Sequence, residues 1–167
     1  MPIRIVEKGY PVDDAWQILH RAYDSILKCE EDTFSKAGIP PQQYQVLRAI
    51  KYFPEEVTAT SIANFLDRNH TSISLIINRM EKDGLVERKI NLEDRRSTKL
   101  VITPKGEKKY KKAIKPAKDL PYRILSVLSE EELLALTGIL GKVAEKTYEI
   151  RDIKDKVIQV KPINLSK

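Results

Sequence analysis

Apolar residues recur at three- and four-residue steps near the start of the chain, which is the spacing of one face of an α-helix. This pattern runs from residue 13 to about residue 37, and Gly38 follows as a residue that commonly stops helices. A second helix is predicted from Pro40-Pro41, since proline suits the first helical turn, to about residue 53. The apolar face of the first helix consists of Ala15, Ile18, Leu19, Ala22, Ile26 and Cys29.

Two short helices joined by a tight turn are predicted next. The first is Thr58–Leu66, with Thr58 as its cap, and Asp67-Arg68 forms the connection. Asn69 is suited to cap the second helix, which extends to Asp83-Gly84, because its side chain can accept a hydrogen bond from a free backbone amide. The apolar positions of this second helix form one stripe, which is Ile73, Ile76, Ile77 and Met80.

A β-hairpin is predicted after this pair of helices. Residues 85–90 and 98–102 alternate in the pattern of half-buried strands, and the polar residues 91–97 join them. Thr103-Pro104 then has the form of an N-cap followed by a first-turn proline. We expect a further helix from this point, and we expect Pro116 and Pro121 to kink or break it.

The last predicted helix begins with a capping box, in which Ser129 and Glu132 have the required spacing. Its apolar positions cover a broad arc, which indicates packing against more than one neighbour. The arc consists of Leu133, Leu134, Leu136, Ile139, Leu140 and Val143. After this helix, residues from about 152 to 167 have weak periodicity and are interpreted as a tail or an arm.

Composition limits the class of protein. A chain of 167 residues with 41% hydrophobic residues allows one domain, or one domain with an attached helical platform. No apolar run is long enough for a transmembrane helix and the first ten residues lack the apolar stretch of a signal peptide, so we expect a cytoplasmic protein. Cys29 is the single cysteine, which excludes an internal disulfide. With no Cys/His pair and no glycine-rich phosphate loop, we expect no catalysis, no metal and no cofactor.

Positive charge is concentrated in the middle of the chain. The net charge of +6 is moderate. Residues 61–118 hold 15 Lys and Arg against 7 Asp and Glu, whereas the rest of the chain has a slight acidic excess. This distribution is typical of a nucleic-acid contact surface, although a solvated lysine-rich helix gives a similar count.

The two short helices make a helix-turn-helix, in which the second helix approaches base edges in the major groove of DNA. Its exposed face is polar, and its first carboxylate, Glu81, lies at the far end. Local capping is the alternative role for serine and threonine near a helix start. The candidate DNA-binding residues of this helix are Asn69, His70, Thr71, Ser72, Ser74, Asn78 and Arg79.

The hairpin tip is the second candidate for a DNA contact. Arg95 or Arg96 is suited to enter the minor groove, where the potential is most negative. We interpret Asp94 as the partner that orients a wing arginine. The alternative is an ordinary surface turn with exposed ion pairs, which contribute little to stability.

From about residue 38 to residue 112 the chain is similar to the winged helix-turn-helix of the MarR-type (multiple-antibiotic-resistance) transcriptional regulators. The Asp-x-Arg wing followed by a Thr-Pro-x-Gly helix start is the most specific part of the resemblance. The residues that carry it are Gln43-Tyr44 with Val46-Leu47, Ile62-Ala63 with Leu66, Arg79-Met80-Glu81 with Gly84-Leu85-Val86, Asp94-Arg95-Arg96, and Thr103-Pro104 with Gly106.

The resemblance implies a mainly α fold with a small β-hairpin wing, in which four helices, the hairpin and two further helices follow one another. It implies a DNA-binding domain at 38–106, and a helical dimerisation region formed by 1–37 and 107–167. It further implies a homodimer on a pseudo-palindromic operator, with Arg96 in the minor groove and Asp94 as its partner. A small-molecule effector pocket between the dimerisation helices and the DNA-binding lobe is also implied.

Several positions depart from the family pattern, among them Pro40-Pro41 at the start of the second helix and Arg68 just before the recognition helix. Leu75 stands where a basic residue is common, which predicts one DNA contact fewer. Pro116 and Pro121 interrupt the helix that normally links the two lobes, which changes the expected angle between them.

Cys29 and the aromatic residues each have two interpretations. Some members of the family sense oxidants through a cysteine in the N-terminal helix, but Cys29 lies on the apolar side of that helix, where a buried cysteine acts as a small hydrophobic residue. Aromatic residues at helical spacing are suited to the core, with lining of an effector pocket as the alternative. They are Trp16, Tyr23, Phe34 and Tyr44.

The leading hypothesis is a dimeric, sequence-specific DNA-binding regulator, specifically a repressor that a small-molecule effector releases. The alternative is a winged-helix module that binds another protein without specific DNA binding. A protein-binding wing would be apolar and nearly neutral, so the basic central segment favours DNA.

Overall fold

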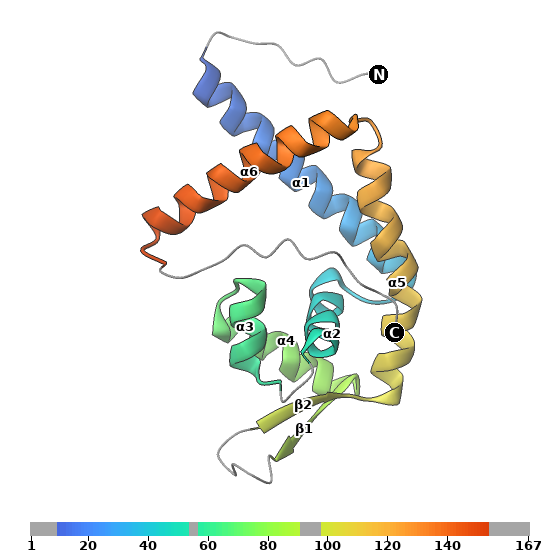
Figure 1. Ribbon diagram of the computed structural model, residues 1–167. Coiled ribbons are helices and arrows are strands. Elements are labelled where there is room, and N and C mark those ends of the chain that lie inside the picture. Colours follow the sequence, from blue (N-terminus) through green and yellow to red (C-terminus); the bar gives the residue numbers. More distant parts are fainter. Residues whose placement is uncertain (1–9, 54–56, 91–97, 154–167) are drawn as a thin grey trace. The chain divides into compact units, whose positions relative to one another are not determined.

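The computed structural model describes residues 10–53, 57–90 and 98–153. Within these residues it contains helices and one two-stranded antiparallel sheet, which confirms the predicted fold class (Figure 1). The chain divides into two compact units, one extending to Pro121 and the other starting at Tyr122. The elements are α1 (Pro11–Ala37), α2 (Pro41–Tyr52), α3 (Ala59–Leu66), α4 (His70–Lys82), β1 (Val86–Ile90), β2 (Thr98–Ile102), α5 (Pro104–Leu125) and α6 (Glu130–Ile150).

The helix starts follow the predicted capping chemistry. Thr58 Oγ1 accepts a hydrogen bond from the Ser61 amide at 3.1 Å, and Ser61 Oγ accepts one from the Thr58 amide at 2.9 Å. These reciprocal bonds satisfy amides that have no partner inside α3. Asn69 Oδ1 accepts from the Thr71 amide at 2.8 Å in α4. The capping box predicted for α6 is also present.

The core of the first unit lies between α2, α3, α4 and the hairpin, with additional side chains from α1 and α5. The predicted stripe on α4 is confirmed, because three of its side chains are buried and Ile76 is half-buried against the core. This packing fixes which face of α4 points away from the protein. The largest fully buried side chains are Ile39, Val46, Leu47, Ile62, Ile73, Ile77, Met80, Leu85 and Val86.

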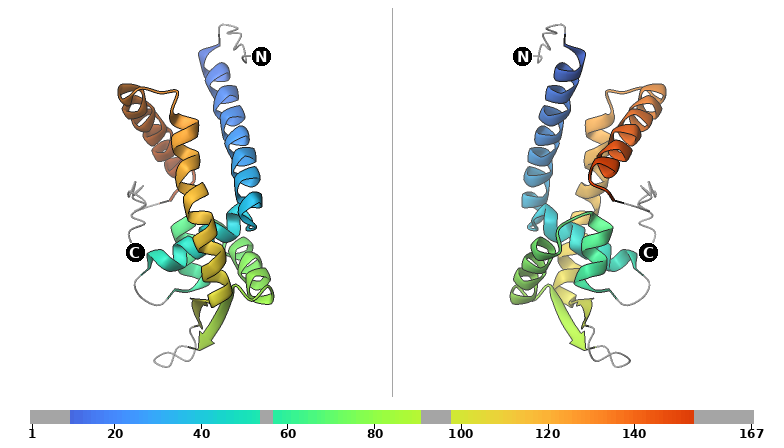
Figure 2. Two further views of the ribbon diagram at one scale, coloured as in Figure 1. Left: turned by 90° about the vertical axis from the view of Figure 1, so that its right-hand side faces the viewer. Right: turned by 90° about the vertical axis from the view of Figure 1, so that its left-hand side faces the viewer.

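The hairpin is fixed to the helices at its base. Val86 pairs with Ile102 and Ile90 with Thr98, and the Leu100 amide donates to the Val57 carbonyl at 2.8 Å. The strands project from one end of the cluster formed by α2, α3 and α4 (Figure 2). The wing therefore leaves the same lobe that contains the helix-turn-helix.

The start of α5 is locked against the end of α4. Thr103 Oγ1 donates to the Gly84 carbonyl at 2.7 Å and accepts from the Gly106 amide at 3.1 Å, which confirms Thr103 as the cap. A Cβ atom on Gly106 would lie 2.0 Å from the Leu85 carbonyl oxygen. Only glycine permits this close approach, so Gly106 fixes where α5 leaves the hairpin.

Three aromatic rings connect α1, α2 and α5. The Phe34 and Tyr44 ring centroids are 4.8 Å apart, and those of Tyr44 and Tyr110 are 5.5 Å apart. All three side chains are buried, so the core interpretation is correct for Phe34 and Tyr44. Trp16 and Tyr23 are exposed instead, so they are not part of this core.

The structure corrects one expectation about individual residues and part of another. Pro116 and Pro121 do not break α5, which continues through both to Leu125. A proline inside a helix removes one backbone donor, and the remaining hydrogen bonds of the helix keep it continuous. Cys29 is exposed rather than buried, because the apolar side of α1 to which it belongs is largely uncovered within the described residues.

The second unit contains α6, whose broad apolar arc has no buried side chain among the described residues. Leu134 is 69% exposed and Ile139 is 60% exposed. Part of α1 has the same character, with Ile18, Leu19 and Ile26 exposed. These helices therefore carry apolar surface that the described part of the chain leaves open to solvent.

Candidate nucleic-acid interface

A tight turn between α3 and α4 sets the direction of α4, and one face of α4 is exposed at the protein surface. Asp67 adopts a left-handed conformation with φ 50°, and the Arg68 amide donates to the Ala63 carbonyl at 2.9 Å. This closes α3 with backbone hydrogen bonds and redirects the chain into α4 within a few residues. The helix-turn-helix predicted from the sequence is therefore present.

Most of the predicted DNA-binding residues of α4 lie on the surface. Ser74 is half-buried, and Asn69 uses its side-chain oxygen as the cap of α4, which supports the capping role for that residue. The free amides at this end of α4 carry a partial positive charge that favours phosphate. The exposed residues of the predicted set are Asn69, His70, Thr71, Ser72, Asn78 and Arg79.

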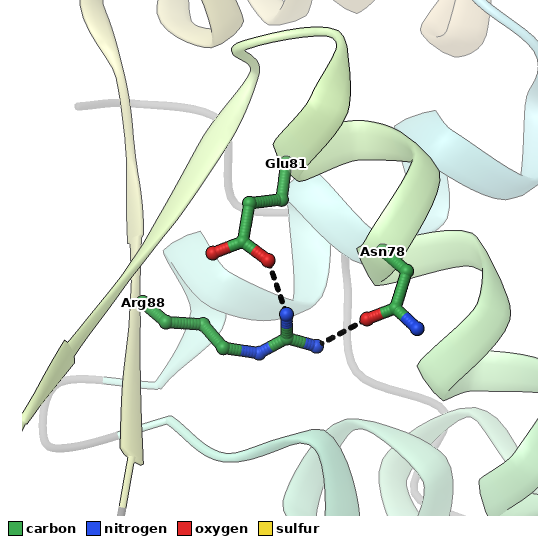
Figure 3. Close-up of polar contacts among 3 residues, drawn as sticks. All are labelled: Asn78, Glu81 and Arg88. Carbon is green, nitrogen blue, oxygen red and sulfur yellow. Dashed lines mark hydrogen bonds and ion pairs between the residues drawn. The ribbon is translucent and has the colours of Figure 1, made fainter.

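Arg88 on β1 joins the hairpin to α4, a role that the sequence did not predict (Figure 3). Its guanidinium donates to Asn78 Oδ1 at 2.7 Å and forms an ion pair with Glu81. Asn78 and Glu81 are three residues apart on α4, so they share one side of the helix. The alternation of residues 85–90 predicted that Arg88 lies on a strand. It does not show which helix lies beside that strand, so it could not identify Asn78 and Glu81 as partners.

The contact with Arg88 fixes the orientation of the Asn78 amide. A guanidinium only donates hydrogen bonds, so the amide oxygen must face it. The Asn78 side chain is exposed, and its Nδ2 group is therefore the part left for an external acceptor. Arg88 also offsets the charge of Glu81, the first carboxylate along α4.

The predicted wing tip falls outside the described residues. Asp94, Arg95 and Arg96 belong to residues 91–97, so the proposed pairing of Asp94 stays a prediction. The structure does describe the base of the wing, where Ile90 pairs with Thr98.

Charged side chains around α4 and the start of α5 are mostly basic and exposed. Lys105 Nζ donates to the Asp83 carbonyl at 2.7 Å, which holds this lysine beside the end of α4. One turn further along α5, lysines line a shallow open depression, and all the residues that line it come from α5. This depression is therefore not the effector pocket that the family resemblance implies between the two lobes. The depression is lined by Pro104, Glu107, Lys108, Lys111 and Lys112.

Burial changes the titration of three groups in the first unit. Burial raises the pKa of Tyr44 to about 12, and the neighbouring Tyr110 adds to this effect. The pKa of Tyr110 is raised for the same reason. Burial also raises the pKa of Glu30 on α1, while the positive charges of Arg48 and Arg68 oppose the change.

Within the described residues, no three His, Cys, Asp or Glu side chains are grouped in a way that would hold a metal ion. The helices of the same residues include none with the length and apolar character needed to cross a membrane.

Comparison with known proteins supports the assignment that this geometry suggests. The model of the MarR family matches residues 37–97. The HTH-type transcriptional repressor MdtR of Bacillus subtilis (strain 168) is 30% identical over 125 residues, which cover 74% of this chain and 80% of MdtR. The chain belongs to the MarR family.

Solved structures of MarR-type regulators have the same fold. The ligand-bound structure of the organohalide-sensing regulator RdhR has a TM-score of 0.81 at 17% identity, covering 96% of this chain and 95% of that one. The DNA complex of MepR from S. aureus has a TM-score of 0.72 at 18% identity, covering 78% and 96%. At these identities the likeness shows the fold alone.

Membership of the MarR family decides between the classes of function considered from the sequence. The protein is a DNA-binding transcriptional regulator and not an enzyme. The alternative of a winged-helix module that binds only protein is not supported by these relatives.

Proposed function

We propose that the protein is a homodimeric repressor that binds a pseudo-palindromic operator and is released by a small-molecule effector. The repressor role is supported by the name of MdtR, the relative with 30% identity. The dimer is supported by the exposed apolar surfaces of α1 and α6, since large apolar patches mark interaction sites. The proposed dimerisation region is 1–37 with 107–167, and the proposed DNA-binding domain is 38–106.

The exposed face of α4 is the observation that best supports this proposal. Its buried stripe turns the opposite face outward, which is polar apart from Leu75, and Glu81 is paired with Arg88. A face of this kind can enter the major groove without placing a free carboxylate against phosphate. The proposed contacts to the major groove come from Asn69, His70, Thr71, Ser72, Ser74, Asn78 and Arg79.

We propose the hairpin tip as the second contact, with Arg96 in the minor groove, Asp94 as its brace and Arg95 beside it. The strands that lead to the tip are anchored to the core through Leu100 and Val86, which are buried. An arginine on a rigid base loses less freedom on binding than one on a free loop.

Selection of bound duplexes from a random DNA pool tests the function. We expect the full chain to recover sequences with two related half-sites, and we expect sedimentation to give the mass of a dimer. Arg79→Ala should weaken binding to the recovered duplex and leave the sedimentation mass unchanged, because Arg79 lies on α4 outside the proposed dimerisation region. Recovery of no preferred sequence at low salt would instead support the module that binds protein.

The effector is proposed by analogy with the fold. RdhR has a structure in its 2,4-dichlorophenol-bound form. Chlorinated phenols are therefore a suitable first panel, with release of the selected duplex measured by fluorescence anisotropy. Cytoplasmic localisation is part of the same proposal, because a regulator of this kind acts where the DNA is.

A further inference from the structure

Leu75 is an apolar residue in the middle of the outward face of α4. Its side chain is 54% exposed. The residues one turn before and after it, Thr71 and Arg79, are exposed, and so is Asn78. Side chains three and four positions apart are neighbours on a helix, so Leu75 is surrounded by polar groups and not by other apolar ones. It therefore lies at the centre of the surface proposed to face DNA.

The location of Leu75 distinguishes it from an ordinary surface leucine. Single exposed leucines are common and need no special explanation. Leu75, however, lies on the side of α4 away from Ile73 and Ile77, which are buried, so it is not part of the core of this chain. A leucine side chain has no hydrogen-bonding atoms and cannot bind phosphate or the polar groups of a base edge.

The major groove offers one apolar group on a base edge, the C5-methyl group of thymine. We propose that Leu75 is a specificity-determining residue that packs against a thymine methyl group in each half-site. The inference rests on the proposed function, since it requires α4 to enter the major groove. It adds an apolar contact to the hydrogen bonds that the polar residues of α4 can make with base edges.

The expected change in affinity for DNA can be estimated from the burial of one methyl group. Burying a methyl-sized apolar group contributes about 0.8 kcal/mol, which corresponds to about a fourfold change in affinity. Deoxyuridine differs from thymidine in this methyl group alone, and it keeps the pairing and the hydrogen-bonding edge of the base. Replacing a single thymine by deoxyuridine thus isolates the proposed contact.

The experiment uses the full chain and the duplex recovered from the random pool. Each thymine is replaced in turn by deoxyuridine, and the dissociation constant is measured at fixed salt. We expect one thymine per half-site at which the replacement weakens binding by about fourfold. With Leu75→Ala the same replacement should have no effect, while Leu75→Met, which keeps an apolar side chain of similar size, should retain it. A duplex with cytosine at that position should bind more tightly when the cytosine carries a 5-methyl group.

The outcomes separate this inference from the function on which it rests. Recovery of no preferred duplex would overturn both. Specific binding in which no thymine methyl contributes would overturn the role of Leu75 and leave the function intact. The same holds if the methyl dependence persists unchanged in Leu75→Ala. If Leu75→Ala changes sedimentation from one oligomeric state to another, Leu75 contacts a second copy of the chain and the inference is wrong.

Discussion

Arg88 on β1 donates a hydrogen bond to Asn78 on α4 at 2.7 Å, so the wing strand and the recognition helix are linked by side chains. The link is close to the surface, and Glu81 completes it from the same side of α4. For a protein that uses both elements on DNA, this contact sets the orientation of Asn78 and restrains the distance between the two elements. Its contribution to binding is expected to exceed its contribution to stability.

Replacing Arg88 by Met should lower stability by less than about 1 kcal/mol, because the pair with Glu81 is partly exposed. Binding to the selected duplex should weaken, since the Asn78 amide is no longer held with its oxygen inward. A double-mutant cycle with Asn78→Ala should give a coupling energy of about 0.5–1.5 kcal/mol for binding. Lys89→Met is the control from the same strand, and additive effects of Arg88 and Asn78 would show that the contact has no role in binding.

Replacing Arg96 by Ala should weaken binding by about 1–3 kcal/mol, the usual scale for an arginine that reads a groove. The measurement is a titration of the selected duplex with protein at several salt concentrations. The slope of affinity against salt concentration reports how many phosphate contacts are lost. Arg123→Ala provides the comparison at equal charge, with its sedimentation mass checked because residue 123 lies in the proposed dimerisation region. An affinity that is unchanged by Arg96→Ala would argue against the wing assignment.

Gly106→Ala should destabilise the protein by about 3 kcal/mol, the upper end of the range for overpacking, because its Cβ would lie 2.0 Å from the Leu85 carbonyl oxygen. Gly138→Ala is the matched control: apart from its chain neighbours and its own helix backbone, no atom of the described residues lies within 4 Å of its Cβ position, and alanine is the better helix former. Chemical denaturation of both variants tests the pair. Equal effects would mean that the close approach at Gly106 is not required.

Tyr44 should make stability fall at high pH. Its pKa is raised to about 12 in the folded protein from an ordinary value of 10.0. The folded state therefore keeps a proton that the unfolded state loses above about pH 10, so stability is full below that pH and decreases as pH rises towards 12. Tyr44→Phe should reduce this slope in urea unfolding between pH 9 and 11.5. Tyr122→Phe, at an exposed tyrosine, is the matched substitution for comparison.

The order of elements, the caps and the helix-turn-helix were predictable because they depend on residues close together in the sequence. Thr58 with Ser61, Asn69 with Thr71 and Ser129 with Glu132 act within one helical turn. The periodic stripe on α4 identified its buried face in the same way. The predicted domain limits and the contacts of the wing tip stay predictions.

Tertiary structure decided the features that depend on segments meeting in space. The sequence placed Arg88 on a strand, but only the packing of β1 beside α4 made Asn78 and Glu81 its partners. Likewise, the need for glycine at position 106 comes from the Leu85 carbonyl, which lies on a different part of the chain. The apolar spacing of α1 suggested that Cys29 was buried, yet burial requires a covering surface, and hydrophobic periodicity does not specify whether the chain itself provides one.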